Sequence, residues 1–219
     1  MELTSEQIRV LGCLVEKEAT TPDNYPLSTN ALVAACNQTT NRDPIVRYTD
    51  REVDQVMLTL REEGLARTVR GDGQRVHKHR HVLGEAWGLE PAQLAVLSVL
   101  MLRGAQTAAE CRTRTERYGV GLDTEGAERV LRSLAERDEP LVRRLERRPG
   151  EREARWVHLL GGDRMADEQA SAPVAAPAAA PSVARTDARR DELTELRTRV
   201  DELERRFAAL LERLGEDVE

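Results

Sequence analysis

Hydrophobic residues return every three or four positions in the N-terminal part of the chain, which predicts a series of short amphipathic helices. The first is expected between Thr4 and Glu18. Thr4 can cap this helix, and Gln7 stands three residues later, where its side chain completes a capping box. The apolar face of this helix would contain Ile8, Leu11, Leu14 and Val15.

A second and a third helix follow the same rules. Ser28 can cap the second, and Thr49 can cap the third, with Glu52 in the capping-box position. Gly64 stands where a residue of left-handed conformation commonly ends a helix. The apolar face of the third helix would contain Val53, Val56, Met57 and Leu60.

The residues after the third helix predict a β-hairpin. Leu65–Arg70 and Gln74–Leu83 have the composition of strands, and Gly71–Gly73 that of a turn. Three helices followed by a hairpin with a basic tip is the order of elements in a winged helix-turn-helix domain. Residues 1–88 are therefore predicted to form such a domain.

The same order of elements recurs in residues 89–162. Thr107, with Glu110 three residues later, can cap the middle helix of this second set. Leu141–Leu145 and Ala154–Leu160 predict a second hairpin. The repeat aligns Gln93–Met101 with Gln7–Val15, and Val130–Glu136 with Val56–Glu62. The predicted fold is mostly α with small β-hairpins (α+β), arranged as two tandem winged helix-turn-helix domains.

The C-terminal part of the chain has a different composition. Residues 163–188 are rich in Ala, Pro and Ser and predict a disordered linker, whereas residues 189–215 predict a coiled-coil helix. Its a and d positions are Leu193, Leu196, Val200, Leu203, Phe207, Leu210 and Leu214. This seam favours a parallel homodimer, and the alternative is a helix that folds back onto the domains of its own chain.

Bulk composition narrows the class of protein. The chain has 219 residues, of which 40% are hydrophobic and only 3% aromatic, so its cores must be aliphatic. Cys13, Cys36 and Cys111 are widely spaced, which favours buried thiols in a reducing cytoplasm. No apolar run is long enough for a membrane span, and the N-terminus lacks a signal-peptide pattern, so we expect a cytoplasmic protein without a membrane partner.

Net charge works against a simple nucleic-acid interpretation. The whole chain carries −6, distributed as −2 in residues 1–88, +1 in residues 89–162 and −5 in residues 163–219. Because no segment is strongly basic, any contact with nucleic acid must depend on local patches.

The first hairpin contains the densest basic patch, opposed only by Asp72. Its cations, which are candidates for contacts with phosphate groups, are Arg67, Arg70, Arg75, Lys78 and Arg80. In the second hairpin, six arginines are diluted by Glu146, Glu151 and Glu153. The alternative for both hairpins is a basic surface that faces solvent or a protein partner.

The third helix would enter the major groove in a DNA-bound winged helix. Its only plausible readers of base edges are Arg51, Gln55 and Thr59, assisted by Arg42 and Arg47 from the preceding loop. Several carboxylates on the same helix would be repelled by phosphates. Base-specific reading is therefore expected to be weak.

Other chemistry has little support in the sequence. His77, His79 and His81 alternate along a strand, so they either form a zinc-binding edge or, as we favour, an exposed edge that gains charge in mild acid. No nucleophile and base pair, phosphate-binding glycine loop or paired-carboxylate motif is recognisable. We expect no catalytic residues, no cofactor and no metal site.

Several motifs resemble the YceH-like family of bacterial cytoplasmic proteins. They include Thr20–Pro22, Tyr25–Ser28, Cys36–Gln38, Thr40–Arg42, Arg67–Val69, Arg103–Thr107 and Pro149-Gly150. The resemblance covers about residues 3–160 and departs from the family pattern at His79–Val82. It implies two winged-helix domains and no assigned activity, and it supplies no catalytic or ligand residues.

Two functions from different classes therefore remain open. The first is a dimeric, cytoplasmic, non-enzymatic protein that binds DNA or RNA through the first basic hairpin, in a regulatory role. The second is a protein-interaction scaffold whose winged helices dock partner chains without binding DNA.

Overall fold

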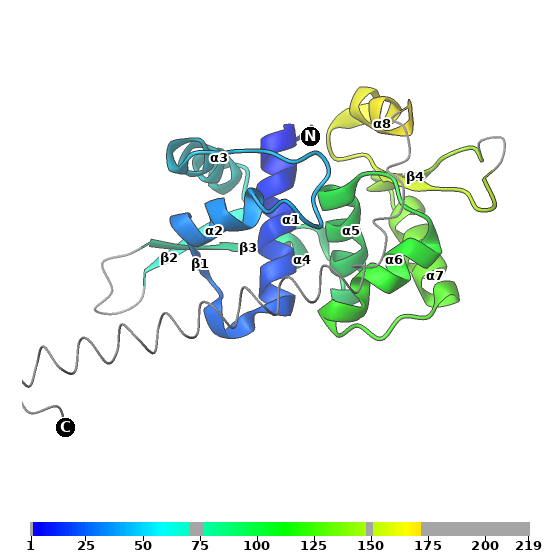
Figure 1. The fold of residues 1–219 in the computed structure, drawn as a ribbon, viewed down its shortest axis with the longest axis horizontal. Coiled ribbons are helices and arrows are strands. Elements are labelled where there is room, and N and C mark those ends of the chain that lie inside the picture. The colour runs from blue at the N-terminus through cyan, green and yellow to red at the C-terminus, as the bar shows by residue number, and fades with distance from the viewer. Residues whose placement is uncertain (1, 71–76, 148–150, 172–219) are drawn as a thin grey trace, which may run out of the picture. The chain divides into compact units, whose positions relative to one another are not determined.

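Two largely buried helices lie side by side at the centre of the protein (Figure 1). They are α1 (Ser5–Thr20) and α5 (Pro91–Arg103). The structure is a computed structural model, and it describes residues 2–70, 77–147 and 151–171. The backbones approach closely at Gly12, where an added Cβ would lie 3.0 Å from the side chain of Leu102. Ser98 also donates a hydrogen bond of 3.1 Å to the carbonyl of Gly12. The described residues belong to one compact unit, and the boundary after residue 88 stays a prediction.

The first half of this unit packs on one side of α1 (Figure 1). After the short 3-10 helix η1 (Pro22–Asn24) and strand β1 (Leu27–Ser28), it contains α2 (Thr29–Cys36) and α3 (Asp50–Glu62). Strands β2 (Ala66–Arg70) and β3 (His77–His81) pair antiparallel, and β1 joins the other edge of β3, so that the sheet order is β1-β3-β2. Helix α4 (Leu83–Trp87) then leads to α5.

The second half repeats this order around α5. It contains α6 (Ala108–Thr115), the 3-10 helix η2 (Glu116–Tyr118), α7 (Thr124–Ala135) and the antiparallel strands β4 (Val142–Arg144) and β5 (Trp156–His158). Gln106, just before α6, exchanges two backbone hydrogen bonds of 2.9 and 2.7 Å with Trp156. This bridge occupies the place that β1 has in the first half.

Local sequence signals explain most helix boundaries. The capping boxes predicted at Thr4, Thr49 and Thr107 are all formed, and Ser28 caps α2 through the amide of Ala31. Gly64 adopts the left-handed conformation after α3, with φ of 73°. The mixed helix and sheet content predicted from the sequence is therefore confirmed.

One prediction is wrong over part of its length. Residues 163–171, expected to begin a disordered linker, lie in helix α8 (Gly162–Ser171), which contacts β5. Ala166 is fully buried, and Arg143 of β4 pairs with Asp163 and Asp167, so packing and charge pairing stabilise this helix. The remainder of the predicted linker and the whole heptad seam lie outside the described residues.

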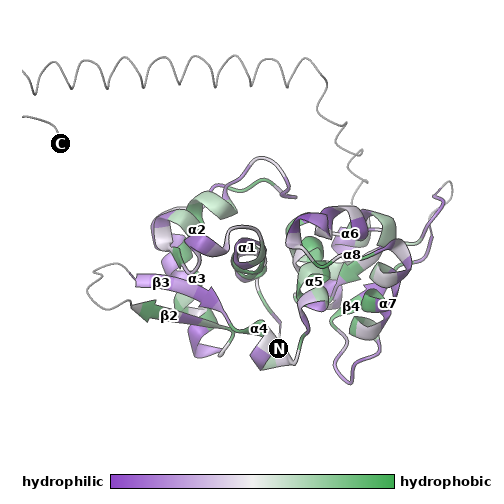
Figure 2. Cartoon of the chain, turned by 90° about the horizontal axis from the view of Figure 1, so that it is seen from below, coloured by the Kyte–Doolittle hydropathy of each residue, from purple (hydrophilic) through white to green (hydrophobic). Residues whose placement is uncertain are grey.

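The buried residues of both halves form one aliphatic cluster, as the low aromatic content predicted. Its largest fully buried side chains are Leu11, Leu14, Leu32, Met57, Leu60, Leu65, Leu83, Leu97, Leu100, Leu102, Leu131 and Leu134. Figure 2 shows the contrast between apolar α5 and hydrophilic β3. The strand β3 and the outer faces of α3 and α7 are thus among the polar surfaces available for function.

Candidate nucleic-acid interface

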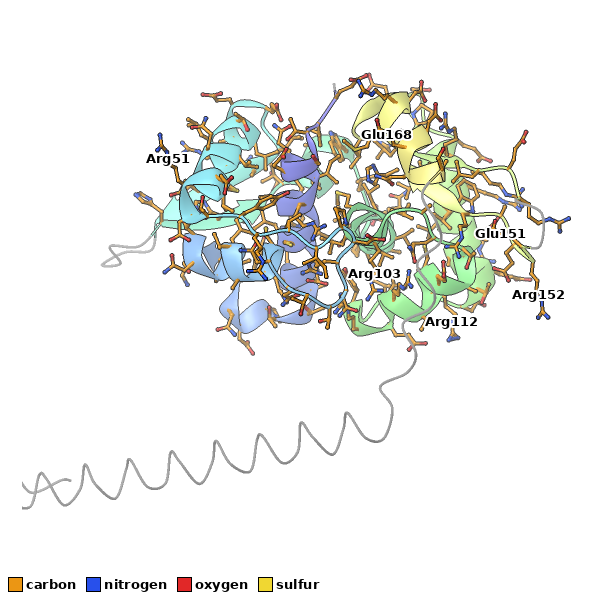
Figure 3. The ribbon with its side chains drawn as sticks, turned by 45° about the horizontal axis from the view of Figure 1, so that its top comes forward. Arg51, Arg103, Arg112, Glu151, Arg152 and Glu168 are labelled. Atoms are coloured by element: carbon orange, nitrogen blue, oxygen red, sulfur yellow. The ribbon has the colours of Figure 1, made fainter. Side chains whose placement is uncertain are left out.

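The sequence predicts that the first basic hairpin is the main nucleic-acid interface and that the outer face of α3 assists it. Val53, Met57 and Leu60 anchor the inner face in the core. Arg51 and Gln55, four residues apart, share the opposite face and are both exposed. Figure 3 shows Arg51 projecting away from the body of the protein.

Thr59 has a more internal role than the sequence suggests. It is half-buried, and its hydroxyl donates to the carbonyl of Val56 at 2.9 Å and accepts from Gln7 at 3.3 Å. Gln7 also donates to both carboxylate oxygens of Glu63, at 3.0 and 3.1 Å. The Thr59 hydroxyl therefore helps to hold α3 on α1 and has little freedom to read a base.

The two loop arginines have opposite environments. Arg47 is exposed beside the N-terminus of α3. Arg42 is buried, with no exposed side-chain surface, and its guanidinium binds both carboxylate oxygens of Glu16 at 2.5 and 3.1 Å. It also donates to the carbonyls of Ala35 and Asn41. Four of its five N–H donors are used within the fold and its side chain is buried, so Arg42 does not belong to the candidate interface.

The antiparallel register of β2 and β3 sets which residues lie opposite the basic side chains. Arg67 lies opposite Arg80 on the neighbouring strand, and Val69 lies opposite Lys78. Both arginines reach Glu85 of α4, at 3.2 Å for Arg67 and 2.9 Å for Arg80. One carboxylate thus offsets two guanidinium groups, and a single positive charge remains at the base of the hairpin.

Lys78 lies on the central strand β3, between Ser28 of β1 and Val69 of β2. Together with Lys17 and Ser28, its half-buried side chain lines a shallow groove between α1, the residues around η1, and α2. Arg70 ends β2, and Arg75 belongs to residues 71–76, which lie outside the described residues together with the Arg70 side chain. The sequence remains the only basis for placing Arg70 and Arg75 near the hairpin tip.

The histidine edge differs from the sequence prediction. His77 is exposed, but His79 and His81 are each only 5% exposed. His79 contacts the hydroxyls of Thr29 and Thr68 at 3.0 and 3.2 Å, and burial lowers its pKa. The expectation of an exposed edge that gains charge in mild acid is therefore wrong for this residue, because β1 and α2 cover it.

His81 is held by Glu18 and by the backbone of Leu83. Its Nε2 lies 2.7 Å from a carboxylate oxygen of Glu18, and its Nδ1 accepts from the amide of Leu83 at 3.3 Å. The hydrogen bond from His81 lowers the pKa of Glu18. The described side chains contain no group of three His, Cys, Asp or Glu residues placed to hold a metal ion.

Two arginines of the second hairpin, Arg143 and Arg155, are already paired. Arg143 binds Asp163 and Asp167 of α8, and Arg155 binds Glu110 at 2.7 Å. Between this hairpin and α7 lies an open groove of about 760 Å³ with alternating charges. It is lined by Ala108, Thr124, Glu125, Glu128, Arg144, Leu145, Glu146, Arg147, Arg152, Glu153 and Ala154. This mixture of charges suits a protein surface better than a phosphate backbone.

The carboxylates that pair with these cations are not recognisable from the sequence pattern. Glu16, Glu18 and Glu85 each bind a basic or histidine side chain that lies distant in sequence or on another element. Glu16 directly follows the apolar residues Leu14 and Val15 of α1, and this position is the one sequence signal for its burial. Among residues 2–70, 77–147 and 151–171, every helix is too short or too polar to cross a lipid bilayer.

Comparison with known proteins identifies the family. Residues 3–151 match the family described as "Protein of unknown function, DUF480". The chain belongs to the DUF480 family. A DUF480 relative, the UPF0502 protein of Pelobacter propionicus, is 52% identical over 169 residues, which are 77% of each chain. The UPF0502 proteins of Geobacter metallireducens and Serratia proteamaculans are 51% and 46% identical, over 77% and 74% of this chain and 77% and 78% of their own. The uncharacterised bacterial family expected from the motifs is thereby confirmed.

Proposed function

We propose that residues 1–88 and 89–162 are two winged helix-turn-helix domains and that the first one binds nucleic acid. Support comes from the order of elements, in which a helix, a short extended segment, two helices and a hairpin occur in each half. The extended segment pairs with the last strand in both halves, as β1 with β3 and as Gln106 with Trp156. An edge strand of this kind between the first two helices is typical of winged helices.

The observation that carries the proposal is the outer face of α3 beside the first hairpin. Arg47, Arg51 and Gln55 are all exposed there, at or after the start of the helix that this fold inserts into a groove. Lys78 adds a charge from β3, and Arg67 and Arg80 together retain one positive charge beyond Glu85. The surface can therefore contact phosphates on both sides of a groove.

The binding would be weak and dominated by the backbone. Asp50, Glu52, Asp54 and Glu62 are exposed on α3 as well, and they oppose the approach of phosphates. Gln55 is the one exposed amide on α3 and is suited to adenine. We therefore propose affinity that is strongly salt-dependent and only slightly sequence-dependent, in a regulatory or architectural role.

A salt titration with random duplex DNA tests this proposal. Replacing Arg70, Arg75 and Lys78 by Gln in the full-length chain should weaken binding and lower the slope of log K against log salt by about 2–3. The matched control removes the same charge from the second half, through Arg112→Gln, Arg129→Gln and Arg164→Gln. Equal loss in both triple variants, or no binding by the wild type at low salt, contradicts the proposal.

One observation favours a protein-docking function for the same helix. Leu58 of α3 is 43% exposed, and it stands four residues from both Asp54 and Glu62. An apolar side chain flanked by carboxylates suits a basic, amphipathic partner segment better than a phosphate backbone. Replacing Leu58 by Gln leaves the charge unchanged, so an unaltered DNA affinity together with loss of a defined partner would support docking.

We further propose that the protein is a cytoplasmic homodimer joined through its C-terminal heptad segment. The supporting observations are the uninterrupted a/d spacing of residues 193–214 and the three buried, free cysteines. Leu203→Asp with Phe207→Asp in the full chain should halve the mass in analytical ultracentrifugation. Glu195→Gln with Glu202→Gln, outside the seam, provides the control, and unchanged mass in the seam variant contradicts dimerisation.

A further inference from the structure

Four arginines gather where the loop after α2 meets α5, α6 and η2. We call Arg42, Arg103, Arg114 and Arg117 the seam arginines, because they come from both halves of the protein. Arg103 is the last residue of α5, and its guanidinium donates to the side-chain oxygen of Asn41 in the loop (Figure 3). The loop itself is fixed on α5 by a 2.8 Å hydrogen bond from the amide of Asp43 to the carbonyl of Leu102.

The cluster contains more cations than carboxylates. Glu16 is fully enclosed and forms ion pairs with Arg42 and Arg117, so its charge is already shared. Neither Arg103 nor Arg114 forms an ion pair with any carboxylate of the described residues. Four guanidinium groups around one paired carboxylate leave a surplus of positive charge at neutral pH, although Glu110, which pairs with Arg155, also acts on Arg114.

One of these guanidinium groups has an unused donor in the interior. The Nη1 atom of Arg114 is enclosed and has no hydrogen-bond partner among the described residues. Buried donors in folded proteins are almost always satisfied, and a charged donor left without a partner is costly. Arg103 is only half-buried and Arg117 is 41% exposed, so the cluster can be reached from solvent.

The electrostatic environment agrees with this geometry. Burial, together with repulsion from Arg114, Arg117 and Arg42, lowers the pKa of Arg103 to about 10. Burial also lowers the pKa of Arg114. Both groups remain cationic at neutral pH, so their mutual repulsion persists in the folded protein and an anion bound between them would relieve it.

We propose that three of the seam arginines, Arg103, Arg114 and Arg117, form a binding site for an oxyanion of the phosphate class, whereas the buried Arg42 contributes only its charge. The planar guanidinium group matches two oxygens of a phosphate group, and a surplus of positive charge favours a multivalent anion over a carboxylate. The ligand would be a free phosphate compound or a phosphate group of a nucleic-acid strand. The site is separate from the outer face of α3 and does not depend on the proposed function of that surface.

Inorganic pyrophosphate is the direct probe, measured by calorimetric titration of the full-length protein at low salt. The double variant Arg103→Gln/Arg114→Gln should bind it at least about tenfold more weakly than the wild type. The control variant Arg112→Gln/Arg129→Gln removes the same charge from exposed i,i+4 pairs and should keep wild-type affinity. Acetate at the same ionic strength should bind the wild type much more weakly than pyrophosphate.

A second measurement separates binding from folding. Without pyrophosphate, Arg103→Gln should melt at or above the wild-type temperature, because the substitution removes repulsion. With pyrophosphate, only the wild type and the control should gain thermal stability. The variant Arg103→Lys/Arg114→Lys keeps both charges but loses the planar guanidinium groups, so it should bind pyrophosphate with intermediate affinity.

The two sources of phosphate give different results with a DNA duplex. Loss of pyrophosphate binding with unchanged duplex affinity in the Arg103→Gln/Arg114→Gln variant indicates a free phosphate compound. Parallel loss of both indicates a strand phosphate. The proposal is overturned if the wild type does not bind pyrophosphate, or if the control and the double variant lose affinity equally.

Discussion

The carboxylate of Glu16 lies 2.5 Å from the guanidinium of Arg42, and neither side chain has any exposed surface. Burial alone would raise the pKa of Glu16, but the hydrogen bond and charge of Arg42, helped by Arg117 and Lys17, place it below its ordinary value. This ion pair ties α1 to the loop after α2.

Breaking this pair should be strongly destabilising. Arg42→Met leaves Glu16 charged beneath the loop, and we expect the free energy of unfolding to fall by about 3–5 kcal/mol in urea denaturation. Arg129→Met, which breaks an exposed pair with Glu125, should cost less than about 1 kcal/mol. The double variant Glu16→Leu/Arg42→Met should recover most of the loss, and a double variant as unstable as Arg42→Met would contradict this explanation.

Stability should fall in mild acid because of His158. This side chain is 1% exposed, and burial lowers its pKa to about 4. Between that value and about 6.5, the unfolded chain takes up a proton that the folded chain excludes. The stabilisation is therefore complete above pH 6.5 and is lost as the pH falls towards 4, by about 3 kcal/mol.

The variant His158→Gln isolates this contribution. It should flatten the pH dependence of unfolding between pH 7 and pH 4, whatever its stability at pH 7. The exposed His77 provides the matched control, and His77→Gln should leave the wild-type pH profile unchanged. A wild-type profile that stays level across this range would show that His158 is not excluded from protonation.

A larger side chain at Gly12 should destabilise the contact between α1 and α5. A Cβ there would lie 3.0 Å from Leu102 and 3.2 Å from Met101, so Gly12→Val should lower the free energy of unfolding by about 2–3 kcal/mol. Gly64, which has open space around it, provides the comparison. Gly64→Ala should cost only about 1–2 kcal/mol, from its left-handed backbone. Partial rescue of Gly12→Val by Leu102→Ala would identify crowding as the cause.

Charge at the base of the first hairpin should set the affinity for DNA. Because Glu85 offsets Arg67 and Arg80, Glu85→Gln should raise affinity for random duplex at low salt by about three- to tenfold. Glu168→Gln, on α8 of the second half, makes the same change in net charge (Figure 3). If both variants gain affinity equally, net charge rather than the hairpin controls binding.

Local signals made much of the fold predictable. Capping boxes at Thr4, Thr49 and Thr107 and the glycine turn at Gly64 depend only on near neighbours in sequence, so their patterns can be read directly. Helix α8 could not be predicted in this way. The burial of Ala166 depends on tertiary packing, and the ion pairs of this helix reach Arg143 on a strand about twenty residues earlier.

The candidate interface was harder to predict because charge pairing is a long-range property. Arg42 and Arg47 look equivalent in the sequence, yet a carboxylate twenty-six residues earlier encloses one and leaves the other exposed. His79 similarly looks like an edge residue until β1 covers it. Charged positions can be read from the sequence, but their partners depend on the tertiary fold.

The close packing of α1 against α5 limits which substitutions the two halves of the protein can accept independently. Each half of the chain covers apolar residues of the other where α1 meets α5, so either half alone would expose them to solvent. A chimaera that joined the N-terminal half of one relative to the C-terminal half of another would need matching shapes at Gly12, Ser98 and Leu102. Exchange of one half between family members should therefore be tolerated only where the residues on both sides of this contact change together.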